Sequence, residues 1–140
     1  MPYNILVVDD SSTMRKVLKK TIGMCGIGEV TFYEAENGQM ALEVIKKEWI
    51  DLIFTDINMP IMNGIELVKT LRTDEVVKNT PIIVVTSDTG AENTNEVKAN
   101  NIRDIIYKPF RPEIVRSLLL NLLGLEESDE ENTDFEGCDF

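Results

Sequence analysis

The sequence predicts an α/β fold in which helices cover both faces of a doubly wound, five-stranded parallel sheet. Short runs rich in Ile, Val and aromatic residues alternate with stretches in which apolar residues recur every three or four positions. The runs ILVV at 5–8 and IIVV at 82–85 are apolar throughout. Central strands of a parallel sheet are buried on both faces and have this composition.

The five predicted strands are short, mostly rich in β-branched or aromatic residues, and bordered by turn-forming residues. In chain order they are residues 5–8, 29–34, 50–55, 81–86 and 104–107.

Helices are predicted after each strand, from apolar residues at helical spacing. The first three have their apolar positions within 14–22, 40–45 and 65–71. The last begins with Pro112, which suits the first turn of a helix, and its apolar face ends before Gly124. Five helices therefore accompany five strands.

The fourth helix, at 90–100, has the least apolar surface. Its only apolar positions are Ala91, Val97 and Ala99, among several Asn and Thr residues. Little burial means little local stability. We therefore expect this helix to be loosely held.

Charge and length indicate one folded domain at 1–124 and an acidic tail at 125–140. The net charge is -11, yet eight of the 25 acids lie in residues 126–140, which contain no base. Such a composition is typical of a disordered segment, although Phe135 and Phe140 leave open a short docking peptide. The remaining 17 acids and 14 bases provide no basic face for nucleic acid.

The cysteines and the N-terminus favour a cytoplasmic protein. Cys25 and Cys138 form neither a metal-type pair nor a disulfide framework. Residues 1–4 lead directly into the first strand, without the basic and long apolar regions of a signal peptide. No run of eighteen apolar residues occurs, so we expect no membrane span.

Charged and hydroxyl side chains follow or end four of the predicted strands. Asp9 and Asp10 follow the first, Asp56 follows the third, Thr86 ends the fourth and Lys108 follows the fifth. In an open parallel sheet, ligands bind outside the carboxyl ends of the strands. We therefore expect these residues to form one site.

A site of this composition requires a cation. Two carboxylates about 5 Å apart repel by on the order of 3 kcal/mol at an effective dielectric of about 20. Because the chain has no His, oxygen ligands favour Mg²⁺ or Mn²⁺ over zinc. Mg²⁺ commonly completes its shell with water and phosphate. A metal and Lys108 beside Asp56 would suit an aspartyl phosphate, because both cations stabilise charge on the transferring oxygens.

Four motifs resemble the receiver domain of bacterial response regulators. They are DD at 9–10, DINMPIMNG at 56–64, VTS at 85–87 and KPF at 108–110. The resemblance extends over about residues 4–123. It is strongest to the stand-alone chemotaxis regulators of the CheY type, which implies strand order 2-1-3-4-5.

The resemblance implies how a metal and a phosphoryl group are held. Asp56 is the phosphoacceptor, and Mg²⁺ (or Mn²⁺) is bound by Asp56, by Asp10 and by Asp9, the last directly or through water. Asn58 offers its backbone carbonyl to the same ion. No other cofactor is implied.

The remaining implied roles concern the phosphoryl group itself. The hydroxyl of Thr86 bonds it and swings inward on activation, and Ser87 offers its backbone N–H. Lys108 pairs with a phosphoryl oxygen, and the peptide bond to Pro109 is expected to be cis.

Two positions depart from the family pattern. The family often places Tyr or Phe three residues before the lysine, where this chain has Ile105; its aromatic is Tyr107 instead. The position of the family's aromatic switch is therefore occupied by an aliphatic side chain. Asn63-Gly64 replaces the common Asp-Gly, and we expect it to keep turn capability because Asn tolerates left-handed backbone.

The function implied is that of a single-domain response regulator in a two-component system. A histidine kinase phosphorylates Asp56, and the modified domain binds a downstream protein through its fourth helix, fifth strand and fifth helix. Chemotaxis control is favoured over a relay role, and a monomer is the default. Catalysis would be limited to self-phosphorylation and autodephosphorylation, which leaves open whether the protein counts as an enzyme.

Two alternatives belong to other classes. A small phosphatase with an aspartyl nucleophile would need a second Asp two residues after Asp56, where Asn58 stands. A phosphorylation-independent adaptor would keep the fold without the chemistry, but the intact acidic and lysine positions argue against it.

Overall fold

The computed structural model describes residues 2–125, which form a five-stranded parallel sheet of order β2-β1-β3-β4-β5. The predicted fold class and strand order are confirmed, and the predicted acidic tail at 125–140 lies, apart from Leu125, outside the described residues. The strands are β1 (Tyr3–Val8), β2 (Val30–Ala35), β3 (Leu52–Thr55), β4 (Ile82–Thr86) and β5 (Asp104–Tyr107). The helices are α1 (Ser12–Gly23), α2 (Gly38–Lys47), α3 (Gly64–Arg72), α4 (Ala91–Lys98) and α5 (Pro112–Leu122).

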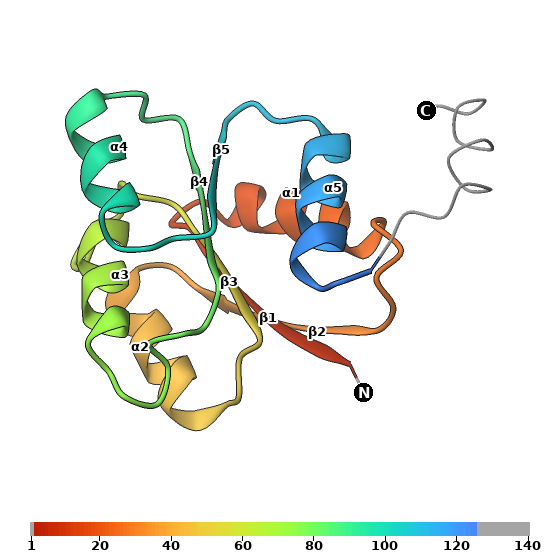
Figure 1. Ribbon diagram of the computed structural model, residues 1–140, viewed down its shortest axis with the longest axis horizontal. Helices are drawn as coiled ribbons and strands as arrows, with labels where there is room; N and C mark the ends of the chain where they lie inside the picture. The colour runs from red at the N-terminus through yellow and green to blue at the C-terminus, as the bar shows by residue number, and fades with distance from the viewer. Residues whose placement is uncertain (1, 126–140) are drawn as a thin grey trace.

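The helices form two layers, with α1 and α5 on one face of the sheet and α2, α3 and α4 on the other (Figure 1). Every residue of the central strands β3 and β4 is buried, which explains their unbroken apolar runs. The edge strands β2 and β5 each keep exposed positions. Among residues 2–125, no helix combines the length and apolar character needed to cross a membrane.

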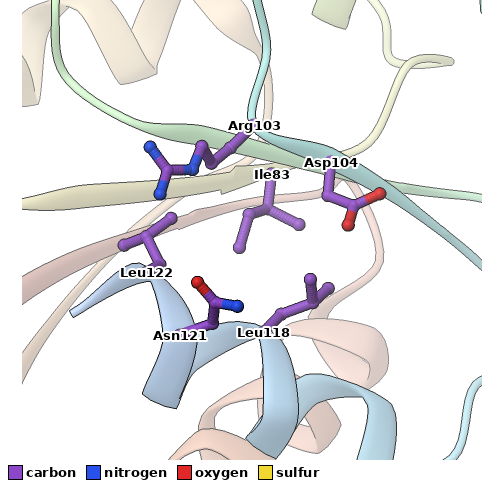
Figure 2. Close-up of a pocket in the computed structure, with 6 residues that line it drawn as sticks. All are labelled: Ile83, Arg103, Asp104, Leu118, Asn121 and Leu122. Atoms are coloured by element: carbon purple, nitrogen blue, oxygen red, sulfur yellow. The ribbon is translucent and has the colours of Figure 1, made fainter. Parts of the chain in front are cut away.

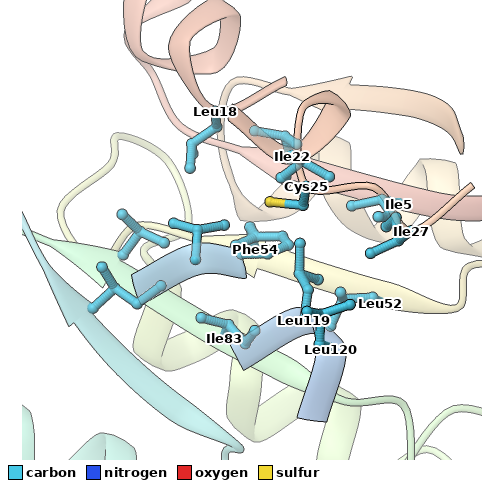
Figure 3. Close-up of a cluster of buried hydrophobic side chains, with 14 residues drawn as sticks. Ile5, Leu18, Ile22, Cys25, Ile27, Leu52, Phe54, Ile83, Leu119 and Leu120 are labelled. Atoms are coloured by element: carbon cyan, nitrogen blue, oxygen red, sulfur yellow. The ribbon is translucent and has the colours of Figure 1, made fainter. Parts of the chain in front are cut away.

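The layer of α1 and α5 encloses the first of two hydrophobic cores (Figure 3). Leu18 and Ile22 of α1 and Leu119 of α5 pack there around Phe54 of β3, which is fully buried. Truncating such a phenylalanine to alanine typically costs about 3–5 kcal/mol. This core therefore fixes the strand that leads directly to Asp56.

The second core lies under α2, α3 and α4, but the three helices contribute unequally. From α3 come Leu67, Val68 and Leu71, whereas the only buried residue of α4 is Val97. The N-cap residue of α4 is Gly90, which has no side chain to cap the first turn of the helix. These observations agree with the expectation that α4 is loosely held.

The start of α3 corrects the explanation predicted for Asn63-Gly64. Asn63 is an extended N-cap residue with φ -82°, and it forms a capping box with Glu66. Left-handed backbone occurs instead at Ile61, whose φ is 69°. The conformation that the turn requires thus lies two residues earlier than we expected, at a β-branched residue that rarely adopts it.

The third strand begins later than predicted, at Leu52 rather than residue 50. Asp51 explains the difference, because its Oδ2 accepts the backbone N–H of Asn4 at 2.8 Å. A side chain therefore takes the place of a backbone acceptor at the start of this strand pair.

Candidate functional site

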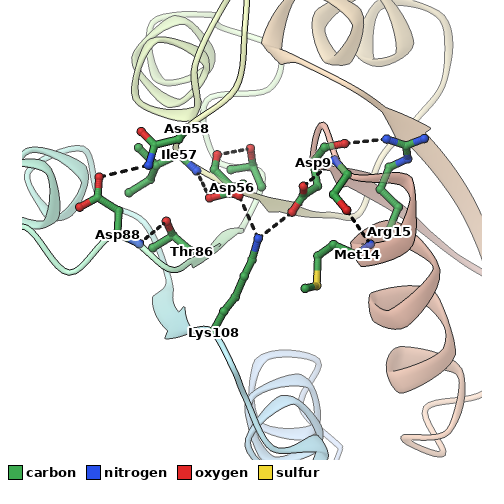
Figure 4. A network of polar contacts seen from close by, with 11 residues as sticks. Asp9, Met14, Arg15, Asp56, Ile57, Asn58, Thr86, Asp88 and Lys108 are labelled. Atoms are coloured by element: carbon green, nitrogen blue, oxygen red, sulfur yellow. Dashed lines mark hydrogen bonds and ion pairs between the residues drawn. The ribbon is translucent and has the colours of Figure 1, made fainter.

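The carboxyl ends of β1, β3 and β5 converge on one cluster of charges (Figure 4). Lys108 Nζ lies 2.9 Å from Asp9 Oδ2 and 2.9 Å from Asp56 Oδ2. Asp9 is 1% exposed and Asp56 is 8% exposed. Three residues distant in sequence are therefore brought together at the predicted edge of the sheet.

Backbone groups orient both carboxylates. The N–H of Ile57 donates to Asp56 Oδ1 at 2.6 Å, and the N–H of Ser11 donates to Asp9 Oδ1 at 2.9 Å. One oxygen of each carboxylate is thus held by the chain itself, and the other faces Lys108. Both acids keep a defined orientation, which a reacting group requires.

Gly64 lets α3 approach the end of β3 closely. Its N–H donates to Ile57 O at 2.8 Å, and a Cβ at this position would lie 2.0 Å from the carbonyl oxygen of Asp56. No side chain fits there without moving the backbone of Asp56. The glycine of the DINMPIMNG motif is therefore explained by packing next to the predicted phosphoacceptor.

Lys108 is held in its charged form. Burial alone would lower its pKa, but the hydrogen bonds and charges of Asp56 and Asp9 outweigh burial and raise the pKa above its usual value. The ammonium group offsets one of the two buried negative charges. The peptide bond from Lys108 to Pro109 is cis, as the resemblance implied.

Thr86 ends β4 at the same edge and is buried. Its hydroxyl oxygen accepts the backbone N–H of Asp88 at 3.0 Å. A hydroxyl that accepts one hydrogen bond can still donate its own hydrogen. The predicted role of Thr86 as a donor to a phosphoryl group is therefore compatible with this contact.

Asp88 is a residue of the site that the sequence did not predict. Its carboxylate accepts the backbone N–H of Gly90 at 2.8 Å and the side-chain amides of Asn93 at 2.7 Å and Asn58 at 3.3 Å. The hydrogen bond from Gly90, followed by those from the two amides, lowers the pKa of Asp88. Asp88 thereby links the loop after β3 to α4.

Three other predicted site residues, Asp10, Asn58 and Ser87, have exposed side chains. Within residues 2–125, no three His, Cys, Asp or Glu side chains gather into a set able to hold a metal ion. The metal-binding and phosphoryl-binding roles assigned to these residues stay predictions.

Arg15 of α1 supports the site from the side of β1 and was also missed. Its Nη1 donates to the carbonyl oxygen of Asp9 at 2.7 Å, and its Nε donates to Glu34 Oε1 at 2.7 Å. Lys19 donates to the other oxygen of Glu34 at 2.6 Å. The hydrogen bonds from Lys19 and Arg15 lower the pKa of Glu34. Helical spacing placed Arg15 and Lys19 on one face of α1, but their partner on β2 depended on strand order.

Comparison with known protein families identifies the family of this chain. The model of the response regulator receiver domain matches residues 5–119. The chain belongs to this family. Among curated relatives, the chemotaxis protein CheY homolog of Campylobacter jejuni is 43% identical over 122 residues, which cover 86% of this receiver domain's chain and 92% of the relative. Chemotaxis protein CheY1 of Helicobacter pylori is 41% identical over 125 residues, covering 88% and 98%.

Solved structures agree with the fold of this receiver domain. The chemotaxis response regulator CheY4 of Vibrio cholerae has a TM-score of 0.73 at 35% identity, covering 89% of this chain and 98% of that one. The receiver domain of a sensor histidine kinase of Pseudomonas aeruginosa has a TM-score of 0.78 at 20% identity, covering 89% and 99%. That second structure has a magnesium ion coordinated in its active-site cleft.

Proposed function

We propose that this receiver domain is a phosphorylation switch in which Asp56 accepts a phosphoryl group from a histidine kinase. The observation that carries the proposal is the position of Lys108 Nζ, 2.9 Å from both Asp56 and Asp9. In the transfer, a carboxylate oxygen of Asp56 bonds to phosphorus, and the bond from phosphorus to the kinase imidazole nitrogen breaks. Lys108 neutralises charge on the transferring oxygens.

Magnesium fits the residues present. Mg²⁺ is typically bound through one or two carboxylates and completes its octahedral shell with water and phosphate oxygens. Asp9 and Asp56, which are buried, would supply carboxylate oxygens, Asn58 a backbone carbonyl, and the exposed Asp10 a further carboxylate. The bound ion would offset negative charge on the phosphoryl oxygens. The same oxygen donors also suit Mn²⁺.

Thr86 and Ser87 complete the proposed phosphoryl site. Both stand at the end of β4, beside the strand that leads to Asp56. The Thr86 hydroxyl donates to one phosphoryl oxygen, and the backbone N–H of Ser87 donates to another. The burial of Thr86 supports this role, because a hydrogen bond is electrostatically stronger where water is excluded.

The output is a change in binding at the surface of α4, β5 and α5. On this surface, the hydroxyl of Tyr107 lies 3.4 Å from Thr94 Oγ1 of α4. Because Val97 is the only buried residue of α4, a movement of Thr86 can shift the position of α4 at a low cost in free energy. Amide hydrogen exchange at residues 90–107 should change when beryllofluoride is added with Mg²⁺. Unchanged exchange would remove this part of the proposal.

The pathway proposed is chemotaxis, with the protein acting as a cytoplasmic monomer. The names of the relatives from Campylobacter jejuni and Helicobacter pylori support a motility role. A histidine kinase would be the phosphoryl donor and a second protein the target of the phosphorylated form. A relay role without motility, a phosphatase and a phosphorylation-independent adaptor are the competing functions.

Incubation with acetyl phosphate and Mg²⁺, followed by intact mass measurement, tests the proposal. One added phosphoryl group is expected in the native chain and none in Asp56→Asn. The matched control is Asp104→Asn, which removes an exposed carboxylate at the start of β5 and should leave phosphorylation unchanged. Absence of the adduct in the native chain would favour the adaptor, and rapid turnover of small phosphate esters would favour the phosphatase.

A further inference from the structure

A concave surface lies between α1 and α5, and none of its lining residues belongs to the cluster of Asp9, Asp56 and Lys108. It encloses about 480 Å³ and is lined mainly by apolar atoms. Its lining residues are Thr21, Met24, Cys25, Pro112, Glu113 and Arg116. We call this surface the α1–α5 groove.

One side of the groove is formed by Met24, an apolar residue that is exposed. Its side chain is 64% exposed, although it follows the last turn of α1 directly. Methionine is flexible and polarizable, and it fills irregular gaps against aromatic partners. The groove is therefore suited to an aromatic side chain of a bound segment.

The positive charge of α1 favours a bound segment of negative charge. The helix contains four bases and no acid. Arg15 and Lys19 both bond to Glu34, whereas the exposed Lys16 and Lys20 make no ion pair within residues 2–125. Lys16 and Lys20 are four residues apart and therefore lie on the same face of the helix, with Met24 four residues further on. An acidic segment is favoured along this face.

The chain itself contains such a segment. Residues 126–140 hold eight acids and no base, and they include Phe135 and Phe140. They follow α5, the helix whose first turns line the groove. Acidic and aromatic residues are thus present in the combination that the groove and α1 would bind.

The connection is long enough. A helix rises about 1.5 Å per residue, so the eleven residues from Pro112 to Leu122 extend over about 16.5 Å. The ten residues 126–135 can extend over up to about 33 Å. Phe135 can therefore reach back past the whole of α5.

We propose that the C-terminal segment 126–140 binds the α1–α5 groove of its own chain. Phe135 or Phe140 contacts Met24 and Pro112, and the acids of the segment lie along Lys16 and Lys20. The consequence is a surface of the receiver domain that is covered by its own chain and uncovered as ionic strength rises, because salt screens contacts between exposed charges.

A rival surface is the smaller pocket beside the end of α5, with a volume of about 220 Å³ (Figure 2). Arg103 is its only basic lining residue, and the carboxylate of Asp104 lines it as well. An acidic segment would meet one charge of each sign there, as it would from Arg116 and Glu113 in the lining of the α1–α5 groove. The groove is favoured because it also adjoins α1, a helix with four bases and no acid.

A nitroxide spin label on Cys138 tests the proposal in the full chain. Burial raises the pKa of Cys25 to about 11, so this thiol reacts slowly at neutral pH and the label attaches to Cys138. Intact mass should show one label per chain. We expect paramagnetic broadening of the amide resonances of residues 21–25 and 113–116, and its loss in 0.5 M salt.

Two charge-reversal variants distinguish docking from chance proximity. Lys16→Glu with Lys20→Glu should abolish the broadening. Lys46→Glu with Lys47→Glu makes the same change of charge in the last turn of α2, on the other face of the sheet, and should leave it intact. Equal effects of the two double variants would overturn the proposal.

Three further outcomes would also overturn it. They are broadening confined to residues 118–125, broadening centred on Arg103 and Asp104, and broadening that appears when spin-labelled chains are mixed with separate ¹⁵N-labelled chains. The first would mean that the segment does not dock and the second that it binds the rival pocket. The third would mean that it binds a second copy of the protein.

Discussion

Asp9 and Asp56 share the ammonium group of Lys108, which lies 2.9 Å from one carboxylate oxygen of each. The two acids are buried, so their repulsion is weakly screened and the single lysine links β1, β3 and β5 at their carboxyl ends. A cation that neutralises Asp56 in the resting protein is also in place to neutralise a phosphoryl group on it. The same contact therefore supports both the fold and the proposed chemistry.

The contact between Asp9 and Lys108 should have a measurable coupling energy. A double-mutant cycle with Asp9→Asn and Lys108→Met, followed by urea unfolding without divalent metal, should give a coupling of about 1–3 kcal/mol. The matched cycle uses Glu75→Gln and Lys78→Met, an exposed pair at 3.1 Å, and should give about 0–0.5 kcal/mol. Similar values for the two pairs would mean that Lys108 does not hold the site together.

Gly64→Ala should destabilise the fold and disturb Asp56. The added Cβ would lie 2.0 Å from the Asp56 carbonyl oxygen, so the backbone must shift, at a cost of about 1–3 kcal/mol. Phosphorylation by acetyl phosphate should slow as well. Gly23→Ala is the control, because a Cβ there contacts nothing within 4 Å. Equal free energies of unfolding in urea for the two variants would contradict the close approach of α3 to the end of β3.

Much of the fold was predictable because its determinants are local. Buried parallel strands require apolar runs, and ILVV and IIVV lie in β1 and β4 as expected. The placement of Asp9, Asp56 and Lys108 followed from a general rule about the carboxyl ends of strands. A short-range pattern combined with one topological rule was sufficient for these residues.

The contacts that were missed depend on tertiary placement. Asp88 accepts a hydrogen bond from Asn58 only because the loop after β4 lies beside the loop after β3, and no spacing in the sequence encodes that distance. Its bond with Asn93, five residues further along the chain, is local. The role of Asn63 was misassigned for a related reason. An Asn-Gly pair fits both a left-handed turn and a helix start, and the capping bond to Glu66 distinguishes them only in the folded chain.

Lowering the pH should weaken the contacts that Glu34 of β2 makes with Arg15 and Lys19 of α1. Hydrogen bonds from Lys19 and Arg15 lower the pKa of Glu34 from its ordinary 4.5, so its contribution to stability is present above pH 4.5 and is lost as pH falls through the lower folded value. Carboxyl NMR should give a Glu34 midpoint below 4.5. Lys19→Gln should raise this midpoint, whereas Lys46→Gln, which alters a base on α2, should not. A midpoint at or above 4.5 in the native chain would contradict the assignment.

The most direct test of the account is to locate the phosphoryl group. After reaction with acetyl phosphate and Mg²⁺, borohydride reduces an aspartyl phosphate to homoserine, which peptide mass spectrometry can identify. Cleavage after Lys47 and Lys69 places Asp56 in the peptide 48–69, apart from Asp9 and Asp10 in the peptide 1–15. We predict homoserine at position 56 alone. Homoserine at position 9 or 10, or at no position in a chain that has gained a phosphoryl group, would contradict the assignment of Asp56.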